Sequence, residues 1–194
     1  RAQYDVLRNW EQLFPPALRI VLGDAYSTDQ FYNNMPRDLL EHVMRTWRGE
    51  RQDSGEPVAE CEKFIARCKR FGVDPREKLF IFSDGLTHEN IVSYYEQFRG
   101  RVGMSFGWGT NLTNDFRGCH PDFDKPFTHI PGVNLTWDQA LAPMSLVCKV
   151  IEVDGTPAVK LSNNPNKATG RSRVVESYKR VFRVGQQVAQ DVVV

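Results

Sequence analysis

Four short apolar runs recur along the chain, each followed by a polar or glycine-rich loop and then, in most cases, by a helical pattern. The runs at residues 19–24, 46–51, 78–82 and 101–106 lead respectively into Ala25-Tyr26-Ser27, Asp53-Ser54-Gly55, Ser83-Asp84-Gly85 and Gly107-Trp108-Gly109-Thr110-Asn111. This alternation predicts parallel βα units. Since ligands of parallel α/β proteins bind at the carboxyl ends of the strands, the loops predict a site for a phosphorylated sugar.

Between and before these runs, apolar residues recur at helical spacing. This spacing predicts helices over residues 4–14, 37–44, 57–71 and 87–98, and Ser27 is a plausible cap for a further helix that carries Phe31 and Tyr32. Pro57 suits a first helical turn, and Gly72 suits an exit. The chain starts inside its first helical pattern without an initiator Met, so we expect it to be part of a longer polypeptide.

The pattern changes near Phe116. Residues 116–143 are rich in Pro, Gly, Asp and His, which predicts a long irregular excursion. Two β-rich runs, residues 145–153 and 156–161, then flank Asp154-Gly155 and predict an antiparallel hairpin in a separate layer. A helix around residues 174–182 precedes a polar, valine-rich tail. We therefore divide the chain into an α/β part at 1–115, the excursion at 116–143, and a second-domain segment at 144–194.

Composition excludes several classes of protein. The 194 residues are 41% hydrophobic, which is enough for a real core, and 25 basic against 24 acidic residues give a net charge of +1. No global field therefore favours nucleic acid or an anionic membrane. We find no apolar run of 18 residues and no signal peptide. The four cysteines lack metal-finger spacing, and they fit a reducing, cytosolic protein: Cys61, Cys68, Cys119 and Cys148. Cys61 and Cys68 are seven residues apart on one face of a predicted helix, which indicates core thiols.

Three carboxylates stand at or just beyond the predicted strand ends, at Asp24, Asp53 and Asp84. In this position they can accept hydrogen bonds from sugar hydroxyls or bind Mg²⁺. The alternative is helix capping for Asp53 and turn formation for Asp84. Arg51 adds a planar donor suited to a carboxylate or phosphate.

The loop at residues 107–111 can present backbone N–H groups to a phosphate, because glycine permits close approach and the positive backbone angles of an anion nest. It lacks the Gly-Lys-Ser/Thr ending of a Walker loop, and a tight turn is the alternative. Lys149, Lys160 and Lys167 fit either a solvated edge or phosphate contacts. The histidines show no spacing that implies a metal or a catalytic triad: His42, His88, His120 and His129.

Taken together, four ordered motifs resemble the C-terminal half of nicotinate phosphoribosyltransferase. They read RQDSGEP at 51–57, FSDGL at 82–86, SFGWGTNLTND at 105–115 and KLSNNPNK at 160–167, within a resemblance that spans about residues 1–170. The resemblance implies part of an irregular, TIM-like α/β barrel of the type II phosphoribosyltransferase kind. In that family a second α+β domain is made from both chain ends, and the predicted hairpin segment would join it.

The resemblance also implies an activity. Such enzymes join nicotinate to 5-phosphoribosyl 1-diphosphate in NAD salvage, with coupled ATP hydrolysis and Mg²⁺, and they are commonly homodimers with sites at the subunit interface. By motif, Arg51 would pair with the nicotinate carboxylate, while Asp53 and Asp84 would bind ribose hydroxyls. Asp24 would lie near Mg²⁺ and pyrophosphate. Ser83, Gly109 and Thr110 would contact the 5′-phosphate, and the motifs also imply Gly85 and Gly107 as substrate-binding residues.

Two departures qualify the resemblance. Glu56 stands where the family motif usually has Asp, which lengthens a carboxylate beside the sugar site. The family's phosphorylatable histidine and nicotinate-stacking aromatics belong to the N-terminal half, so we expect residues 1–194 alone to be inactive. A related pyridine phosphoribosyltransferase that uses nicotinamide or quinolinate and a non-catalytic phosphosugar-binding barrel remain as alternatives.

Overall fold

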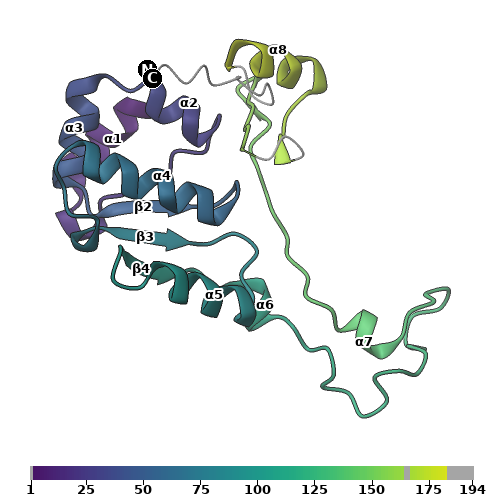
Figure 1. Cartoon of the computed structure of the whole chain (residues 1–194). Coiled ribbons are helices and arrows are strands. Elements are labelled where there is room, and N and C mark those ends of the chain that lie inside the picture. The colour runs from purple at the N-terminus through teal and green to yellow at the C-terminus, as the bar shows by residue number, and fades with distance from the viewer. Residues whose placement is uncertain (1, 164–166, 183–194) are drawn as a thin grey trace.

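The computed structural model describes residues 2–163 and 167–182 (Figure 1). Helices and strands alternate through the first half of the chain, and the later half has fewer and shorter elements. The elements are α1 (Ala2–Leu13), η1 (Pro16–Leu18), β1 (Ile20–Val21), α2 (Thr28–Asn33), α3 (Arg37–Thr46), β2 (Gly49–Gln52), α4 (Pro57–Arg70), η2 (Pro75–Glu77), β3 (Leu79–Phe82), α5 (His88–Phe98), β4 (Gly103–Phe106), α6 (Thr110–Thr113), α7 (Trp137–Ala140), β5 (Glu152–Val153), β6 (Thr156–Pro157) and α8 (Ser172–Phe182).

The central sheet is parallel and has the strand order β1-β2-β3-β4. Figure 1 shows β2 and β3 pointing the same way, with α4 alongside them. Sequential order of parallel strands is what consecutive βα units produce. The predicted α/β class with parallel strands is therefore confirmed.

The strands are shorter than the apolar runs that predict them. At β2 the predicted start is wrong, because residues 46–48 are not strand. Thr46 instead ends α3, and the Trp47 N–H donates to the Val43 carbonyl at 3.0 Å and completes the last helical turn. The strand begins only at Gly49. β1 is likewise confined to Ile20–Val21.

A buried ion pair explains why β2 is so polar for an interior strand. Glu50 is only 3% exposed, and its carboxylate accepts hydrogen bonds from the Tyr32 hydroxyl at 2.7 Å and from the Arg67 guanidinium at 2.6 Å. The guanidinium also lies 3.9 Å from the centre of the Tyr32 ring. Burial, together with the Glu50 carboxylate, raises the pKa of Tyr32 well above its ordinary value, so the hydroxyl remains a donor.

Aromatic side chains of the sheet and its helices form the centre of the core. Phe82 packs against Tyr94, Phe98 and Phe106 with ring centroids 4.9–5.9 Å apart. Cys61 and Cys68 on α4 are fully buried in the same core, as predicted for core thiols. Burial raises the pKa of Cys61, and it raises that of Cys68 to about 11, so both remain protonated thiols.

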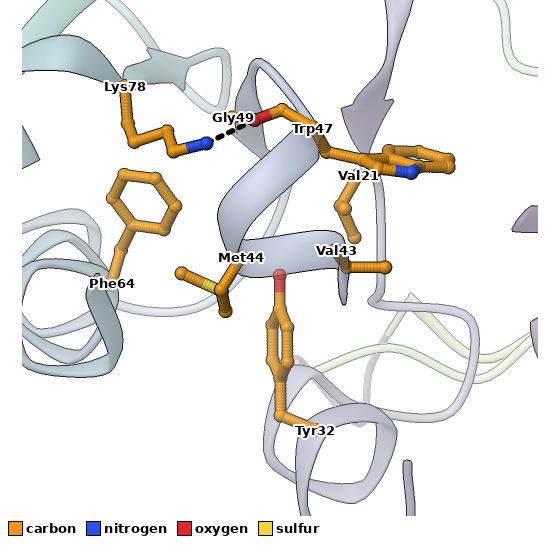
Figure 2. Close-up of a pocket in the computed structure, with 8 residues that line it drawn as sticks. All are labelled: Val21, Tyr32, Val43, Met44, Trp47, Gly49, Phe64 and Lys78. Atoms are coloured by element: carbon orange, nitrogen blue, oxygen red, sulfur yellow. Dashed lines mark hydrogen bonds between the residues drawn. The ribbon is translucent and has the colours of Figure 1, made fainter. Parts of the chain in front are cut away.

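A small pocket lies near the amino ends of β2 and β3 (Figure 2). Lys78 reaches into this region, and its ammonium donates to the carbonyls of Arg45 at 2.9 Å and Trp47 at 2.7 Å. Burial lowers the pKa of Lys78. The pocket volume of about 10 Å³ is close to the least that admits one water molecule, so it is a packing gap and not a ligand site.

After α6 the chain leaves the sheet. Residues 116–143 are irregular apart from the single turn α7, and Figure 1 shows α7 well separated from the strands. The predicted hairpin is present but much shorter than expected, with two residues in each strand. Asp154 and Gly155 both have positive φ, 48° and 75°, the conformation of a two-residue type I′ turn.

The side chains before the hairpin are exposed, which explains its shortness. Leu146 and Val147 are 86% and 74% exposed, so the described residues supply no face on which a longer strand would pack. The helix predicted around residues 174–182 is α8. The tail from residue 183 lies outside the described residues, and the division at 115 and 143 stays a prediction. Within the described ranges, every helix is too short or too polar to cross a bilayer.

Candidate functional site

The polar residues singled out by the sequence gather at one edge of the sheet. β1, β2 and β3 are parallel and in register, so the residues that follow them emerge at the same end. Asp24 follows β1, Asp53 follows β2, and Ser83 and Asp84 follow β3. This carboxyl edge is where parallel α/β proteins bind ligands.

A hydrogen-bond network joins the ends of β2 and β3. The Arg51 guanidinium donates from Nε to Ser83 Oγ at 2.8 Å and from Nη2 to Asp53 Oδ1 at 2.9 Å. Ser83 Oγ in turn donates to the Gln52 carbonyl at 2.7 Å. The Arg51 and Asp53 side chains are still 47% and 39% exposed, so the guanidinium is oriented by its partners while it remains open to a ligand.

Asp24 forms a second, more enclosed part of the edge. It is 6% exposed, and its Oδ2 accepts a hydrogen bond from Ser54 Oγ at 2.8 Å. The Lys160 ammonium lies 3.4 Å from the same oxygen. The Ser54 bond ties the loop after β1 to the loop after β2 and fixes the orientation of the Asp24 carboxylate.

Asp84 also has a lysine partner. The Lys167 ammonium donates to Asp84 Oδ1 at 2.8 Å, across 83 residues of sequence. Gly85 follows with φ 60°, a backbone angle that glycine adopts without strain. Lys160 and Lys167, which fitted either a solvated edge or a phosphate site, thus both lie at the carboxyl edge.

The glycine loop after β4 lies beside Ser83. The Gly107 N–H donates to the Phe82 carbonyl at 2.8 Å, and a Cβ at position 107 would stand 3.0 Å from the Ser83 Cβ. The close approach of this backbone to Ser83 therefore explains why position 107 is a glycine. The expected positive angles of an anion nest are absent here, because neither Gly107 nor Gly109 has a positive φ. Thr110 instead begins the short helix α6.

The capping alternative for Asp53 is wrong. Glu56 caps α4, with its carboxylate accepting hydrogen bonds from the N–H groups of Val58 at 3.1 Å and Ala59 at 2.6 Å. Asp53 is left to pair with Arg51. Glu56, the departure from the family motif, thus engages the helix backbone directly.

Three of the four histidines pack against or bond to neighbouring side chains. His42 bonds to Glu11 at 2.9 Å, and His120 stacks on Trp137 with ring centroids 3.9 Å apart. His129 meets the same Trp137 ring edge-on at 4.9 Å. Among the described residues, no three His, Cys, Asp or Glu side chains form a group that could hold a metal ion.

Sequence reasoning missed several residues of the edge. Ser54 donates a hydrogen bond to Asp24, and its place in the motif at 51–57 does not indicate this contact. Thr28 and Asn163 are bonded to each other across 135 residues, and no local pattern indicates that contact. Lys160 and Lys167, as candidate phosphate contacts, were the sequence indication that this later part of the chain lies at the site.

The sheet and its polar edge define an α/β protein with polar residues gathered at the carboxyl ends of its parallel strands, the edge where proteins of this class bind ligands. The profile of the nicotinate phosphoribosyltransferase (NAPRTase) family matches residues 1–186, and the chain belongs to this family. Several solved structures resemble it. The nicotinate phosphoribosyltransferase of Vibrio cholerae is 34% identical, with a TM-score of 0.75 over 96% of this chain and 40% of that one.

Two further solved structures cover the chain to a similar extent. The nicotinate phosphoribosyltransferase of Porphyromonas gingivalis is 30% identical, with a TM-score of 0.71 over 94% of this chain and 42% of that one. A putative nicotinate phosphoribosyltransferase of Saccharomyces cerevisiae is 25% identical, also with a TM-score of 0.71, over 94% and 40%. The chain thus spans about 40% of the length of these solved structures.

Proposed function

We propose that this chain forms part of an enzyme that joins nicotinate to 5-phosphoribosyl 1-diphosphate, giving nicotinate mononucleotide and pyrophosphate. The observation that carries the proposal is the cluster of Arg51, Asp53, Ser83 and Asp84 at one sheet edge in a chain of the NAPRTase family. The edge offers a planar cation for a carboxylate and two carboxylates for sugar hydroxyls.

The reaction suits such an edge. The pyridine nitrogen of nicotinate attacks the anomeric carbon, and the bond from that carbon to the diphosphate oxygen breaks, so pyrophosphate leaves with the electron pair. The transition state has oxocarbenium character, and positioning with charge stabilisation supplies most of the rate increase. Asp53 and Asp84 would hold the ribose hydroxyls, and Arg51 would orient the base by its carboxylate.

Magnesium fits this edge as an ion that arrives with the substrate. Mg²⁺ commonly keeps several waters and takes one or two protein carboxylates together with phosphate oxygens. Asp24, a buried carboxylate at the edge, suits that arrangement, and the described residues form no cage of three metal-binding side chains. Bound Mg²⁺ would neutralise charge on the leaving pyrophosphate.

Further properties complete the proposal. By analogy with the family, we place the enzyme in NAD salvage in the cytoplasm, with ATP as co-substrate and a homodimer as its assembly. Ser83, Gly109 and Thr110 would contact the 5′-phosphate, and Gly85 and Gly107 complete the substrate-binding set. The phosphoryl-accepting histidine and the aromatic residues that stack on nicotinate would come from the rest of the polypeptide.

The test uses the natural full-length protein. Nicotinate, nicotinamide and quinolinate would each be supplied with 5-phosphoribosyl 1-diphosphate and Mg²⁺, with and without ATP, and pyrophosphate release would be followed. We expect release with nicotinate, stimulated by ATP. Preference for another pyridine would reassign the substrate. Binding of 5-phosphoribosyl 1-diphosphate without pyrophosphate release would indicate the non-catalytic alternative.

A further inference from the structure

One later part of the chain crosses the carboxyl edge of the sheet. We call its described residues, 160–163 and 167, the edge segment. Lys160 reaches Asp24 after β1, Asn163 reaches the Ser54 carbonyl after β2, and Lys167 reaches Asp84 after β3. The segment therefore meets the three strand ends in their order in the sheet.

Asn163 is the anchor of the edge segment. Its Nδ2 donates to Thr28 Oγ1 at 2.9 Å and to the Ser54 carbonyl at 3.3 Å, while its Oδ1 accepts the Thr28 N–H at 2.7 Å. Both polar atoms of the amide are thus hydrogen-bonded. Oδ1 is bonded to α2, and Nδ2 is bonded to α2 and to the loop after β2. An amide is the side chain that can donate and accept in this way.

The backbone around Asn163 is fixed as well. Leu161 is fully buried and its N–H donates to the Ala25 carbonyl at 2.9 Å. Gly55 has φ 90°, and a Cβ there would lie 2.9 Å from Asn163 Nδ2. The close approach of the amide to the β2 loop therefore depends on a glycine at position 55.

The charges at the edge have a consequence for binding. Asp24 and Asp84 are each paired with a lysine of the edge segment, so neither carboxylate stands uncompensated before ligand arrives. A substrate that brings phosphate anions and Mg²⁺ offers these groups new partners, the phosphates for the ammoniums and the cation and hydroxyls for the carboxylates. For this exchange of partners, the lysine ammoniums must already lie close to where the substrate phosphates bind.

We propose that Asn163 is a positioning residue for the phosphosugar site. It holds the edge segment against the loops after β1 and β2, and so sets where the ammoniums of Lys160 and Lys167 meet the anionic groups of the substrate. This inference rests on the proposed function. It predicts that Asn163 governs binding of 5-phosphoribosyl 1-diphosphate and not binding of the pyridine base.

The experiment compares Asn163→Ala with wild type in the full-length protein. We expect the KM for 5-phosphoribosyl 1-diphosphate to rise about tenfold or more, the factor that corresponds to one or two lost hydrogen bonds. The KM for nicotinate should change by less than about twofold. Asn34→Ala is the matched control, because Asn34 makes an exposed bond to the Gln30 carbonyl at 2.9 Å, and both KM values should stay at wild type.

Thr28→Val removes the hydroxyl that accepts from Asn163 and leaves the backbone bond between the two residues in place. We expect a smaller rise of the same KM, about threefold, and no further rise when Thr28→Val is added to Asn163→Ala. This variant carries the test if Asn163→Ala does not fold. Calorimetric titration with Mg²⁺ and pyrophosphate should show the same weakening without any turnover.

The outcomes separate the two proposals. A wild-type protein that binds Mg²⁺ and pyrophosphate but makes no nicotinate mononucleotide would overturn the proposed function. An active wild type whose Asn163→Ala and Thr28→Val variants lose only thermal stability, with an unchanged KM for the diphosphate, would overturn the positioning role alone.

Discussion

Arg51 and Ser83 join two neighbouring strand ends through a hydrogen bond of 2.8 Å from the guanidinium Nε to the serine Oγ. Ser83 Oγ is itself fixed, because it donates to the Gln52 carbonyl. Asp53 holds the far side of the guanidinium at 2.9 Å. The edge therefore presents a cation whose orientation is set before any ligand binds, and such preorganisation lowers the cost of binding.

Replacement of Arg51 tests its role toward the base. Arg51→Ala should raise the KM for nicotinate by about tenfold to hundredfold, because a charge-assisted pair with a carboxylate is lost. Binding of nicotinamide, measured as competitive inhibition, should weaken much less. Equal losses for the acid and its amide would contradict the assignment. Arg51→Lys should restore only part of the affinity, since an ammonium lacks the planar fork.

Ser83 orients Arg51, so its removal should act through the guanidinium. We expect Ser83→Ala to raise the KM for nicotinate by about threefold to tenfold, in keeping with the loss of one hydrogen bond to a charged group. Ser105→Ala on the adjacent strand β4 is the control, because Ser105 is exposed and lies before the strand end. A larger effect at Ser105 than at Ser83 would count against the network.

The buried ion pair of Glu50 and Arg67 supports the strand that carries Arg51. Glu50→Ala should lower the free energy of unfolding by about 3 to 5 kcal/mol, because the Arg67 charge is left buried without its partner. Glu62→Ala is the control. Its pair with Arg101 is about as short, at 2.8 Å, but both side chains are more than 40% exposed, and such pairs contribute about 1 kcal/mol or less. Urea unfolding of both variants measures the difference, and similar losses would contradict the structure.

Glu60 gives stability a defined pH dependence. Burial raises its pKa above the ordinary 4.5, although Lys63 opposes the shift. Because the pKa of Glu60 is higher in the folded than in the unfolded protein, its contribution to stability is fully present below pH 4.5. That contribution is lost as the pH rises through the pKa that Glu60 has in the folded protein. Glu60→Gln should therefore gain stability relative to wild type between pH 4 and pH 7, as measured by urea unfolding at each pH. A gain that shrinks as the pH rises would contradict the shift.

Local sequence signals predicted much of the fold. The run at 78–82 contains β3, and Pro57 begins α4, which ends just before Gly72. These elements depend on neighbouring residues alone. The start of β2 was misplaced because Trp47 completes a turn of α3, and the extent of the hairpin was overestimated because burial of its flanking residues was assumed.

The site was predictable only where its residues follow strand ends. Asp24, Asp53 and Asp84 come together because parallel strands end at one edge, which the βα alternation already implies. The roles of Ser54 and Asn163 could not be predicted, since they come from contacts with side chains and loops distant in the sequence. Pairings of Lys160 and Lys167 with particular carboxylates likewise depend on the path of the chain across the sheet.

The most direct test of the account is a crystal structure of the full-length protein with 5-phosphoribosyl 1-diphosphate and Mg²⁺ bound. We predict the ribose hydroxyls beside Asp53 and Asp84, the diphosphate and Mg²⁺ beside Asp24, and the 5′-phosphate beside Gly109 and Thr110. A phosphosugar bound away from the carboxyl ends of β1 to β4 would contradict the central claim.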